Sequence, residues 1–403
     1  MDGREQRGLE IAATKKLRQK GALWMVPSQT GGSTYVVDPS AAECSCPDYE
    51  TRRATCKHLF AVEFTVRRET PVQDGATVTE TLKVTYRQEW SAYNAAQTNE
   101  KDRVALLLRD LCSAIDNPEQ QGRGRPRLPL SDTVFCAVMK VYGGASGRRT
   151  MCDLRDYAER GLIDRAPHYN SVSNALENPL LTPILKAMIE ESAAPLKSVE
   201  TDFAVDSSGF STLQYERWYS AKYGREMSRS AWLKAHVMIG TTTNVVTCAE
   251  ITPNYGPNAQ DTLHLPALLK RTTQRFNVEK VSADKAYLTK RNFVAIDEAG
   301  AFPLIPFKSN SVPFHATGAG SDLWRKMYYF FTHRQAEFLQ HYHKRSNIET
   351  TFSMIKAKFG SAIRSKTPVA QVNEVLCKIL AHNLCCLVQA FYELGIDAEF
   401  WAA

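Results

Sequence analysis

The sequence has no long apolar run, and this absence is the first constraint on what the protein can be. No stretch of the 403 residues approaches the roughly 20 apolar residues that cross a bilayer. The beginning of the chain, MDGREQRGLEIAATKKLRQKG, is too polar for a secretory signal. Internal repeats are also absent. These features predict a protein with neither a membrane-spanning segment nor a secretory signal.

Neither sign of charge dominates the composition. Lys and Arg number 50 against 43 Asp and Glu, which gives a formal net charge of +7. An excess of this size is compatible with binding to nucleic acid but does not require it. Hydrophobic residues at 43% and charged residues at 23% are typical of a soluble globular protein. The length predicts two or three domains.

Cysteine is too unevenly distributed for a disulfide framework. Three of the ten Cys residues lie within thirteen residues, and the others are scattered. This pattern indicates reduced intracellular thiols together with one metal site.

The chain changes character along its length, which divides it into four segments. Residues 1–88 contain predicted strands at STYVVD, LFAVEFTV and TVTETLKVTYRQ. Residues 89–129 predict a helix and then a linker dense in Pro, Gly and Arg. Residues 130–198 predict a small helical bundle. Residues 199–403 predict an α/β sheet covered by helices, with strands at VETDFAVD, LKAHVMIGT, NVVTCAEIT, KVSAD and FPLIPF.

The stretch ECSCPDYETRRATCKHLF places Cys44, Cys46, Cys56 and His58 in the pattern C-x-C, nine residues, C-x-H. Two pairs of soft ligands at the ends of a short loop can close a tetrahedral Cys₃His zinc site. Because protein fills all four positions, we expect this zinc to be structural, contributing on the order of 10 kcal/mol to folding. The alternative is a set of small buried thiols in a strand pair, which does not explain two alternating pairs that end in His.

Residues 33–62 resemble the SWIM zinc finger, a module found in DNA-handling and protein-interaction proteins. The resemblance implies zinc and contact with DNA or protein, but no particular reaction. Arg52, Arg53 and Lys57 lie between the two ligand pairs. They either contact phosphate or keep the loop solvated.

The linker contains GRGRPR, residues 122–127, which looks like the core of an AT-hook. Extended backbone and the neighbouring glycines would let Arg123 and Arg125 reach into a narrow minor groove. A basic, solvated linker is the alternative that so short a motif leaves open.

Two predicted strands end in an aspartate. The alternation in TDFAVDSSGF ends at Asp206, and in EKVSADKAYLTKRNF a short strand ends in Asp284 before a helix. A buried carboxylate is costly unless something compensates it, and a divalent cation shared by neighbouring strands would compensate both. Taken singly, either aspartate is also a common turn or N-cap residue.

HYHKRSNIETTFSMIKAKFG, residues 341–360, predicts a basic amphipathic helix with one acidic residue, Glu349. At about 100° per residue, one narrow stripe holds Tyr342, Arg345, Glu349 and Lys356. The adjacent stripe is apolar and consists of Ile348, Phe352, Ile355 and Phe359. A simple i,i+4 surface ion pair between Arg345 and Glu349 is the alternative, but it accounts for one pair only.

Three carboxylates on two strands and a helix, those of Asp206, Asp284 and Glu349, fit two-metal phosphoryl transfer. Two Mg²⁺ ions about 4 Å apart can activate a water or a 3′-hydroxyl and stabilise the leaving oxygen. Positioning and charge neutralisation are then the main tasks of the protein. In this interpretation Glu349 is the third metal ligand, and the neighbouring cations hold phosphates.

Residues 200–378 resemble the DDE transposases of bacterial insertion sequences, whose catalytic domain has the ribonuclease H-like fold. The resemblance is carried by AVDSSGF, KAHVMIGTTTNVVTCAEITP, VSADKAYLTKRNF and FPLIPFK. It is also carried by the signature Y-x₂-R-x₃-E-x₆-K, which YHKRSNIETTFSMIK fits at Tyr342, Arg345, Glu349 and Lys356.

The resemblance implies a role for each of these residues. Two Mg²⁺ (or Mn²⁺) ions would be bound by Asp206, Asp284 and Glu349. DNA phosphate or a flipped base would be held by Arg345 and Lys356, and the strand would be supported or contacted by Tyr342. Near these motifs, Lys234 and Lys285 either contact DNA or have buried salt-bridge or surface roles.

The sequence also departs from the family pattern. TPNYGPNAQD is longer than the usual Thr-Pro-Gly-Asn-x-x-Asp stretch, so Asp261 is a weak candidate for a supporting role. An N-terminal SWIM finger is not a general feature of such enzymes. Residues 130–198 lie where related enzymes carry a helical DNA-binding domain. Their candidates for DNA contact, or for a merely solvated face, are Arg148, Arg149, Arg155 and Arg165.

Together these patterns predict a transposase that cuts and joins DNA at the ends of its own mobile element. We expect a homodimer on double-stranded DNA (element ends and target), located in the bacterial cytoplasm at the nucleoid, with no membrane partner. One rival is a nuclease that hydrolyses without joining. The other is a domesticated DNA-binding protein with an inactive nuclease domain, against which the three intact carboxylates argue.

Overall fold

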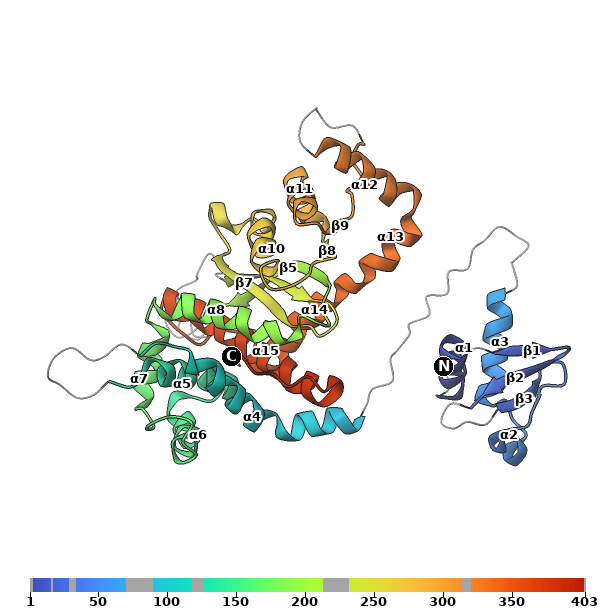
Figure 1. Cartoon of the computed structure of the whole chain (residues 1–403), viewed down its shortest axis with the longest axis horizontal. Helices are drawn as coiled ribbons and strands as arrows, with labels where there is room; N and C mark the ends of the chain where they lie inside the picture. Colours follow the sequence, from blue (N-terminus) through green and yellow to red (C-terminus); the bar gives the residue numbers. More distant parts are fainter. Residues whose placement is uncertain are drawn as a thin grey trace, which may run out of the picture. The chain divides into compact units, whose positions relative to one another are not determined.

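The chain folds into two compact units, residues 1–88 and 89–403 (Figure 1). The structure is a computed structural model, and it describes residues 3–15, 17–28, 34–69, 90–117, 127–212, 232–313 and 320–401. Arg123, Arg125 and the predicted strand at residues 77–88 lie outside these ranges. Each unit is described by itself.

The first unit contains a four-stranded antiparallel sheet in the order β1-β2-β3-β4. Its strands are β1 (Arg18–Lys20), β2 (Leu23–Pro27), β3 (Thr34–Asp38) and β4 (Glu43–Cys44). Its helices are α1 (Gly3–Thr14), α2 (Pro47–Arg52) and α3 (Lys57–Glu69). The small core includes Ile11, Trp24, Val26 and Val37. Helices α1 and α3 approach closely, since a Cβ on Gly8 would clash with the Cβ of Phe60.

The strand predicted at LFAVEFTV, residues 59–66, is wrong because this segment lies within helix α3. A short apolar run has no clear period, and periodicity alone cannot assign it to a strand or a helix. Here Ala61 and Val62 are buried in the core that α3 shares with the sheet. The described part of the N-terminal unit is therefore a small sheet with helices packed on it.

The second unit is built on a five-stranded mixed sheet in the order β7-β6-β5-β8-β9. The strands are β5 (Asp202–Ser211), β6 (Trp232–Gly240), β7 (Val246–Pro253), β8 (Lys280–Ala283) and β9 (Phe302–Leu304). Strands β5, β6 and β7 pair antiparallel, whereas β5–β8 and β8–β9 are parallel pairs. All five strands predicted for residues 199–403 are present, but the prediction that the first one ends at Asp206 is wrong, because β5 stays paired with β6 as far as Ser211.

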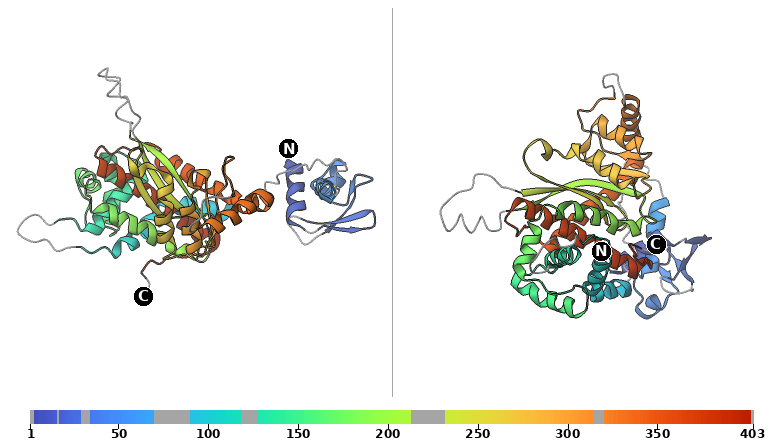
Figure 2. Two further views of the ribbon diagram at one scale, coloured as in Figure 1. Left: turned by 90° about the horizontal axis from the view of Figure 1, so that it is seen from above. Right: turned by 60° about the vertical axis from the view of Figure 1, so that its left-hand side comes forward.

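Helices cover both faces of this sheet (Figure 2). One face carries α10 (Leu265–Thr272) and α11 (Lys290–Glu298), and the other carries α8 (Leu181–Ala193) and α15 (Pro368–Leu394). The short 3₁₀ helices are η1 (Ala194–Leu196), η2 (Pro257–Ala259), η3 (Asp261–Leu263), η4 (Lys285–Tyr287) and η5 (His343–Arg345).

A helical layer packs on α15 and shares one continuous core with the sheet. It contains α4 (Trp90–Ser113), α5 (Leu130–Gly143), α6 (Gly147–Glu159) and α7 (Tyr169–Leu176), in addition to α8. The helices predicted for residues 89–116 and 130–198 are thus present. An ion pair of 2.7 Å between Arg109 of α4 and Asp132 of α5 joins two of them.

The prediction that no segment is apolar enough to span a membrane is wrong for α15, the longest of the described helices. Its 27 residues have a mean hydropathy of 1.5 over an 18-residue window, and 78% of that window is buried inside the protein. Its polar side chains are bonded within the fold: Lys378 donates to Gly360 O at 2.9 Å, and Asn383 donates to Val246 O at 2.7 Å. We therefore interpret α15 as the core helix of the second unit.

After β9 the chain forms α12 (Ser321–His333), α13 (Gln335–Tyr342), η5 and α14 (Ser346–Phe359). The single helix expected over residues 341–360 is thus divided by a 3₁₀ turn at 343–345. Its predicted apolar stripe is confirmed, since the four apolar side chains of α14 are at most 8% exposed: Ile348, Phe352, Ile355 and Phe359.

Candidate active site and metal centre

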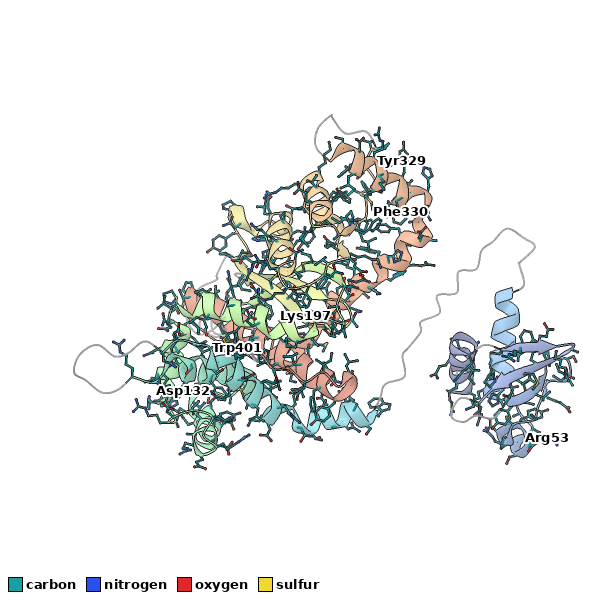
Figure 3. All side chains as sticks on the ribbon, viewed as in Figure 1. Arg53, Asp132, Lys197, Tyr329, Phe330 and Trp401 are labelled. Carbon is teal, nitrogen blue, oxygen red and sulfur yellow. The ribbon has the colours of Figure 1, made fainter. Side chains whose placement is uncertain are left out.

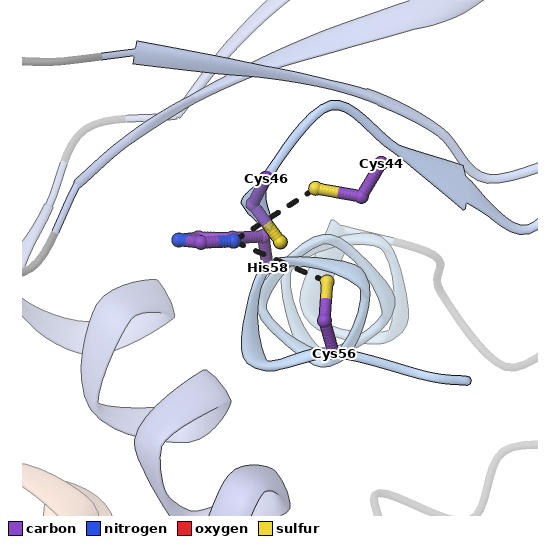
Figure 4. A group of neighbouring side chains, drawn as sticks. All are labelled: Cys44, Cys46, Cys56 and His58. Carbon is purple, nitrogen blue, oxygen red and sulfur yellow. Dashed lines mark hydrogen bonds between the residues drawn. The ribbon is translucent and has the colours of Figure 1, made fainter. Parts of the chain in front are cut away.

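The four predicted zinc ligands come together in the N-terminal unit (Figure 4). Cys44 ends β4, Cys46 caps α2, Cys56 precedes α3, and His58 lies in the first turn of α3. Their ligand atoms all lie within 4.8 Å of one another. His58 Nδ1 faces Cys44 Sγ at 3.8 Å and Cys56 Sγ at 4.0 Å. Three thiols and an imidazole at these separations fit a tetrahedral zinc ion.

The thiols of this cluster influence one another strongly. The hydrogen bond from Cys44 lowers the pKa of the Cys56 thiol to about 3, and the same contact raises the pKa of Cys44. Burial raises the pKa of Cys46. Ionising all three thiols together is therefore unfavourable unless a cation compensates them, as zinc does.

The basic residues around the zinc cluster have local partners. Arg52 forms an ion pair with Asp48, and the guanidinium of Arg53 lies 5.8 Å from the ring centre of Tyr49. Arg53 also ends α2 with a positive φ of 52°. Both arginines remain exposed to solvent, so phosphate contact and simple solvation are both compatible with their positions.

In the second unit, Asp206 and Asp284 lie beside each other. The parallel pair β5–β8 aligns Val205 with Ala283, so each aspartate directly follows a paired residue. Asp206 Oδ1 accepts a hydrogen bond of 2.8 Å from the backbone N–H of Ser207. Asp284 Oδ1 accepts one of 2.8 Å from Ala286 N, so it caps η4, as the simpler interpretation of this residue suggested.

Arg345 connects the two strands to α14. Its Nη2 donates to Asp206 Oδ2 at 2.8 Å, and its Nη1 donates to Glu349 Oε1 at 2.9 Å. The side chain of Arg345 is 16% exposed, and that of Glu349 is 64% exposed. The Arg345–Glu349 ion pair is thus present, but it is one half of a bridge to Asp206 and not an isolated surface pair.

The other two residues of the stripe lie on either side of this bridge. Lys356 Nζ donates to Ser208 Oγ at 2.6 Å and lies 5.4 Å from the ring centre of Phe210, both on β5. Tyr342 stacks on Phe338 with ring centres 5.5 Å apart. Lys356 therefore contacts the strand of Asp206 directly, whereas Tyr342 contacts the preceding turn of its own helix.

The electrostatics of Asp206 favour a cation nearby. Burial raises the pKa of this carboxyl, and the negative charges of Asp284 and Asp261 raise it further, against the opposing effects of Ser207 N–H and Arg345. A divalent cation would offset this clustered charge, and carboxylate oxygens are the ligands Mg²⁺ prefers. The donor set therefore fits the ion.

The three carboxylates are not gathered into one compact ligand group. In the part of the chain that the structure describes, only the Cys₃His cluster brings three or more ligand atoms within 4.8 Å of one another. Asp206 and Asp284 are neighbours, and Glu349 joins them through the guanidinium of Arg345. Metal binding at this site would require the Arg345 bridge to rearrange.

Sequence reasoning underestimated a second set of residues on the same edge of the sheet. Asp261 Oδ1 accepts hydrogen bonds from Ser207 Oγ at 2.7 Å and from Lys234 Nζ at 2.6 Å. His236 Nδ1 lies 3.4 Å from the same oxygen. Burial raises the pKa of Asp261, but the hydrogen bonds from Lys234 and Ser207 outweigh this effect and hold the pKa below its usual value. Lys234 thus has the ion-pair role that was one of its two options.

Strand alternation in the sequence indicates that Lys234 and His236 share a face of β6. It could not indicate their partner, since Asp261 follows an irregular loop and begins η3.

A cavity of about 770 Å³ has none of the three carboxylates in its lining; Figure 3 labels Tyr329 and Phe330, two of its lining residues. It is lined by Lys280 and Phe302, which begin β8 and β9, and by residues of α12 and α13 that include Tyr329 and Phe330. Since Asp284 follows the opposite end of β8, the cavity is not part of the carboxylate site. In the helical layer, the four candidate arginines are exposed on or near α6: Arg148, Arg149, Arg155 and Arg165.

Comparison with models of protein families finds a match for the carboxylate region and another for the zinc cluster. Residues 197–384 match the model of the transposase DDE domain, and residues 35–66 match that of the SWIM zinc finger. The first match spans all five strands, both aspartates and Glu349, and the second spans the complete Cys₃His cluster. A transposase DDE domain implies DNA binding and a nuclease-type activity. The chain therefore combines an N-terminal SWIM zinc finger, with a Cys₃His site suited to structural zinc, and a DDE transposase domain.

Proposed function

We propose that this protein is a metal-dependent DNA transposase that cuts DNA at the ends of its own mobile element and joins those ends to target DNA. The observation that carries the proposal is that two acids from distant parts of the sequence lie on neighbouring strands and that an arginine links one of them to a third acid. Asp206 lies on β5 beside the end of β8, which Asp284 directly follows, and Arg345 joins Asp206 to Glu349 on α14. The mixed strand order of the sheet supports a ribonuclease H-like catalytic domain over residues 199–403.

In this proposal Asp206, Asp284 and Glu349 hold two Mg²⁺ or Mn²⁺ ions. The chemistry supplied by bound ions is activation of a water or 3′-hydroxyl and stabilisation of the leaving oxygen. The exposed carboxylate of Glu349, on a helix that is otherwise anchored by its apolar face, can change its partner at little cost. Arg345 would then be free to neutralise a DNA phosphate.

Lys356 is suited to hold phosphate beside the carboxylates. In the described residues its ammonium is bonded to the neutral hydroxyl of Ser208, and no carboxylate forms an ion pair with it. Burial lowers the pKa of this ammonium, so a nearby anion would stabilise its charged form. Tyr342, stacked on Phe338, would support the same strand of DNA.

DNA recognition would use the other parts of the chain. We assign residues 1–88 to the zinc-finger domain, 89–129 to a helix and basic linker that includes Arg123 and Arg125, and 130–198 to a helical DNA-binding domain. The exposed arginines on and near α6 support the last assignment. We further propose a homodimer on paired element ends, located in the bacterial cytoplasm at the nucleoid.

The test is strand cleavage of element-end DNA in Mg²⁺. We expect Glu349→Gln to lower cleavage by at least about 1,000-fold, because a neutral amide replaces a ligand carboxylate, with DNA affinity changed less than about threefold. The matched control is Glu298→Gln on α11, an exposed acid outside the site, which should cleave like wild type. Cleavage by Glu349→Gln at the wild-type rate would refute the proposal.

Strand transfer separates a transposase from a simple nuclease. Wild-type protein should join a labelled 3′-hydroxyl end to a target plasmid. Release of cut ends that are never joined would instead identify a nuclease, and DNA binding without any cleavage would identify an inactive DNA-binding protein.

A further inference from the structure

Tyr287 is a fully buried tyrosine next to the carboxylate site. It ends η4, the 3₁₀ turn that Asp284 caps, and its side chain is 1% exposed. Its backbone is fixed by hydrogen bonds to Asp284 O (3.1 Å) and from Asn292 Nδ2 (2.8 Å). Helix η4 packs against η3, which begins with Asp261. The backbone of Tyr287 is thus fixed on the turn that follows Asp284 and packs against the turn of Asp261.

The hydroxyl of Tyr287 has no hydrogen-bond partner within the described residues, although it is buried. Buried hydroxyls are nearly always bonded, so a phenylalanine would fill this position at lower cost. Burial is the main effect that raises the pKa of this phenol, and the negative charges of Asp206, Asp261 and Asp284 raise it further. The raised pKa keeps the phenol protonated, so its hydroxyl is available as a hydrogen-bond donor.

We infer that Tyr287 is a positioning residue for the metal-binding carboxylates, donating a hydrogen bond from its hydroxyl to Asp206 or Asp284 when these ligands turn toward a divalent cation. This inference rests on the proposed function. In the arrangement described here, Asp206 uses its two oxygens for Ser207 N–H and Arg345, and Asp284 uses one for its cap. When Arg345 releases Asp206, the carboxylate loses a donor. The buried Tyr287 hydroxyl, on the turn that Asp284 caps, has no partner among the described residues and is available to replace that donor.

The substitution that tests this is Tyr287→Phe, which removes one oxygen and keeps the ring. We expect the Mg²⁺ concentration for half-maximal cleavage to rise about tenfold, and cleavage at limiting Mg²⁺ to fall about 10- to 100-fold, since the lost bond is made to a charged group. The affinity for Mn²⁺, measured by calorimetry on zinc-loaded protein, should fall by a similar factor. Thermal stability should be unchanged or higher, because the substitution removes an unbonded buried hydroxyl.

The matched control is Tyr157→Phe. Tyr157 on α6 is likewise 1% exposed, has a hydroxyl without a hydrogen-bond partner among the described residues, and lies near acidic residues, but it is remote from the sheet edge. Its Phe variant should match wild type in cleavage, in Mg²⁺ requirement and in Mn²⁺ affinity.

Two outcomes would overturn the inference. One is a Tyr287→Phe protein with wild-type Mg²⁺ dependence and Mn²⁺ affinity. The other is a melting temperature several degrees below wild type, because it would show that the hydroxyl is bonded in the fold itself. Asp206→Asn, assayed in parallel, separates this inference from the proposed function. If Asp206→Asn is inactive and Tyr287→Phe is normal, only the role of Tyr287 fails; if Asp206→Asn cleaves normally, the metal assignment fails.

Discussion

At the scale of single residues, Arg345 determines how the carboxylates are arranged. It uses two different nitrogens to hold Asp206 and Glu349, each within 2.9 Å. A lysine has one ammonium and could not span the two acids in this geometry. The bridge keeps Glu349 at the edge of the sheet while leaving its carboxylate 64% exposed. The same arginine is thus placed to exchange carboxylate partners for phosphate.

Single residues of the site were predictable where a regular element fixes their direction. A strand-end position indicated Asp284 correctly, whereas the apolar alternation that indicated Asp206 ends in the middle of β5. Helical periodicity indicated Arg345, Glu349 and Lys356. Asp261 and Tyr287 were not predictable in this way. Both lie in short 3₁₀ helices, whose side-chain directions depend on tertiary packing and leave no period in the sequence.

At the scale of elements, α15 shows how a polar side chain can be built into a buried helix. His382 is 3% exposed and donates from Nε2 to Asn244 O at 2.9 Å. Burial lowers its pKa to about 4. The folded protein therefore keeps His382 neutral at pH values where an unfolded chain would protonate it.

This pKa predicts a loss of stability in mild acid. Between pH 6.5 and 4 the unfolded state binds more protons than the folded state, so the free energy of unfolding falls as pH falls through this window. From pH 7 to pH 5 the contribution of His382 should decrease by roughly 2 kcal/mol. Urea unfolding at both pH values should show a smaller drop for His382→Gln than for wild type. The control is His333→Gln, an exposed residue on α12; equal drops in all three proteins would show that His382 titrates normally.

The elements of the second unit were predictable because their patterns are long. Strands β5 to β9 and helices α4 to α8 all formed where the sequence indicated. LFAVEFTV was assigned wrongly because its pattern was judged without its packing partners, α1 and the small sheet. The apolar length of α15 was missed because polar residues such as Lys378 and Asn383 interrupt its apolar run, and these residues bond inside the protein.

At the scale of the whole molecule, the zinc cluster and the carboxylates belong to different compact units. Zinc should therefore stabilise the first unit without affecting the second. We expect Cys56→Ser to lose about one equivalent of bound zinc and to make residues 1–69 more sensitive to protease, since a structural zinc contributes about 10 kcal/mol or more to folding.

Metal analysis of purified protein and limited proteolysis measure these two effects. Cys152→Ser, which changes an exposed cysteine on α6, is the matched control and should keep its zinc. Equal zinc content in Cys56→Ser and wild type would contradict the Cys₃His assignment.

The central claim is that Asp206, Asp284 and Glu349 bind divalent cations, and crystals of zinc-loaded protein soaked in Mn²⁺ test it most directly. Anomalous scattering at the manganese edge should reveal metal in contact with the carboxylates of both aspartates, with Arg345 displaced from Asp206. Manganese peaks that lie elsewhere, with the Arg345 bridge intact at saturating Mn²⁺, would contradict the account.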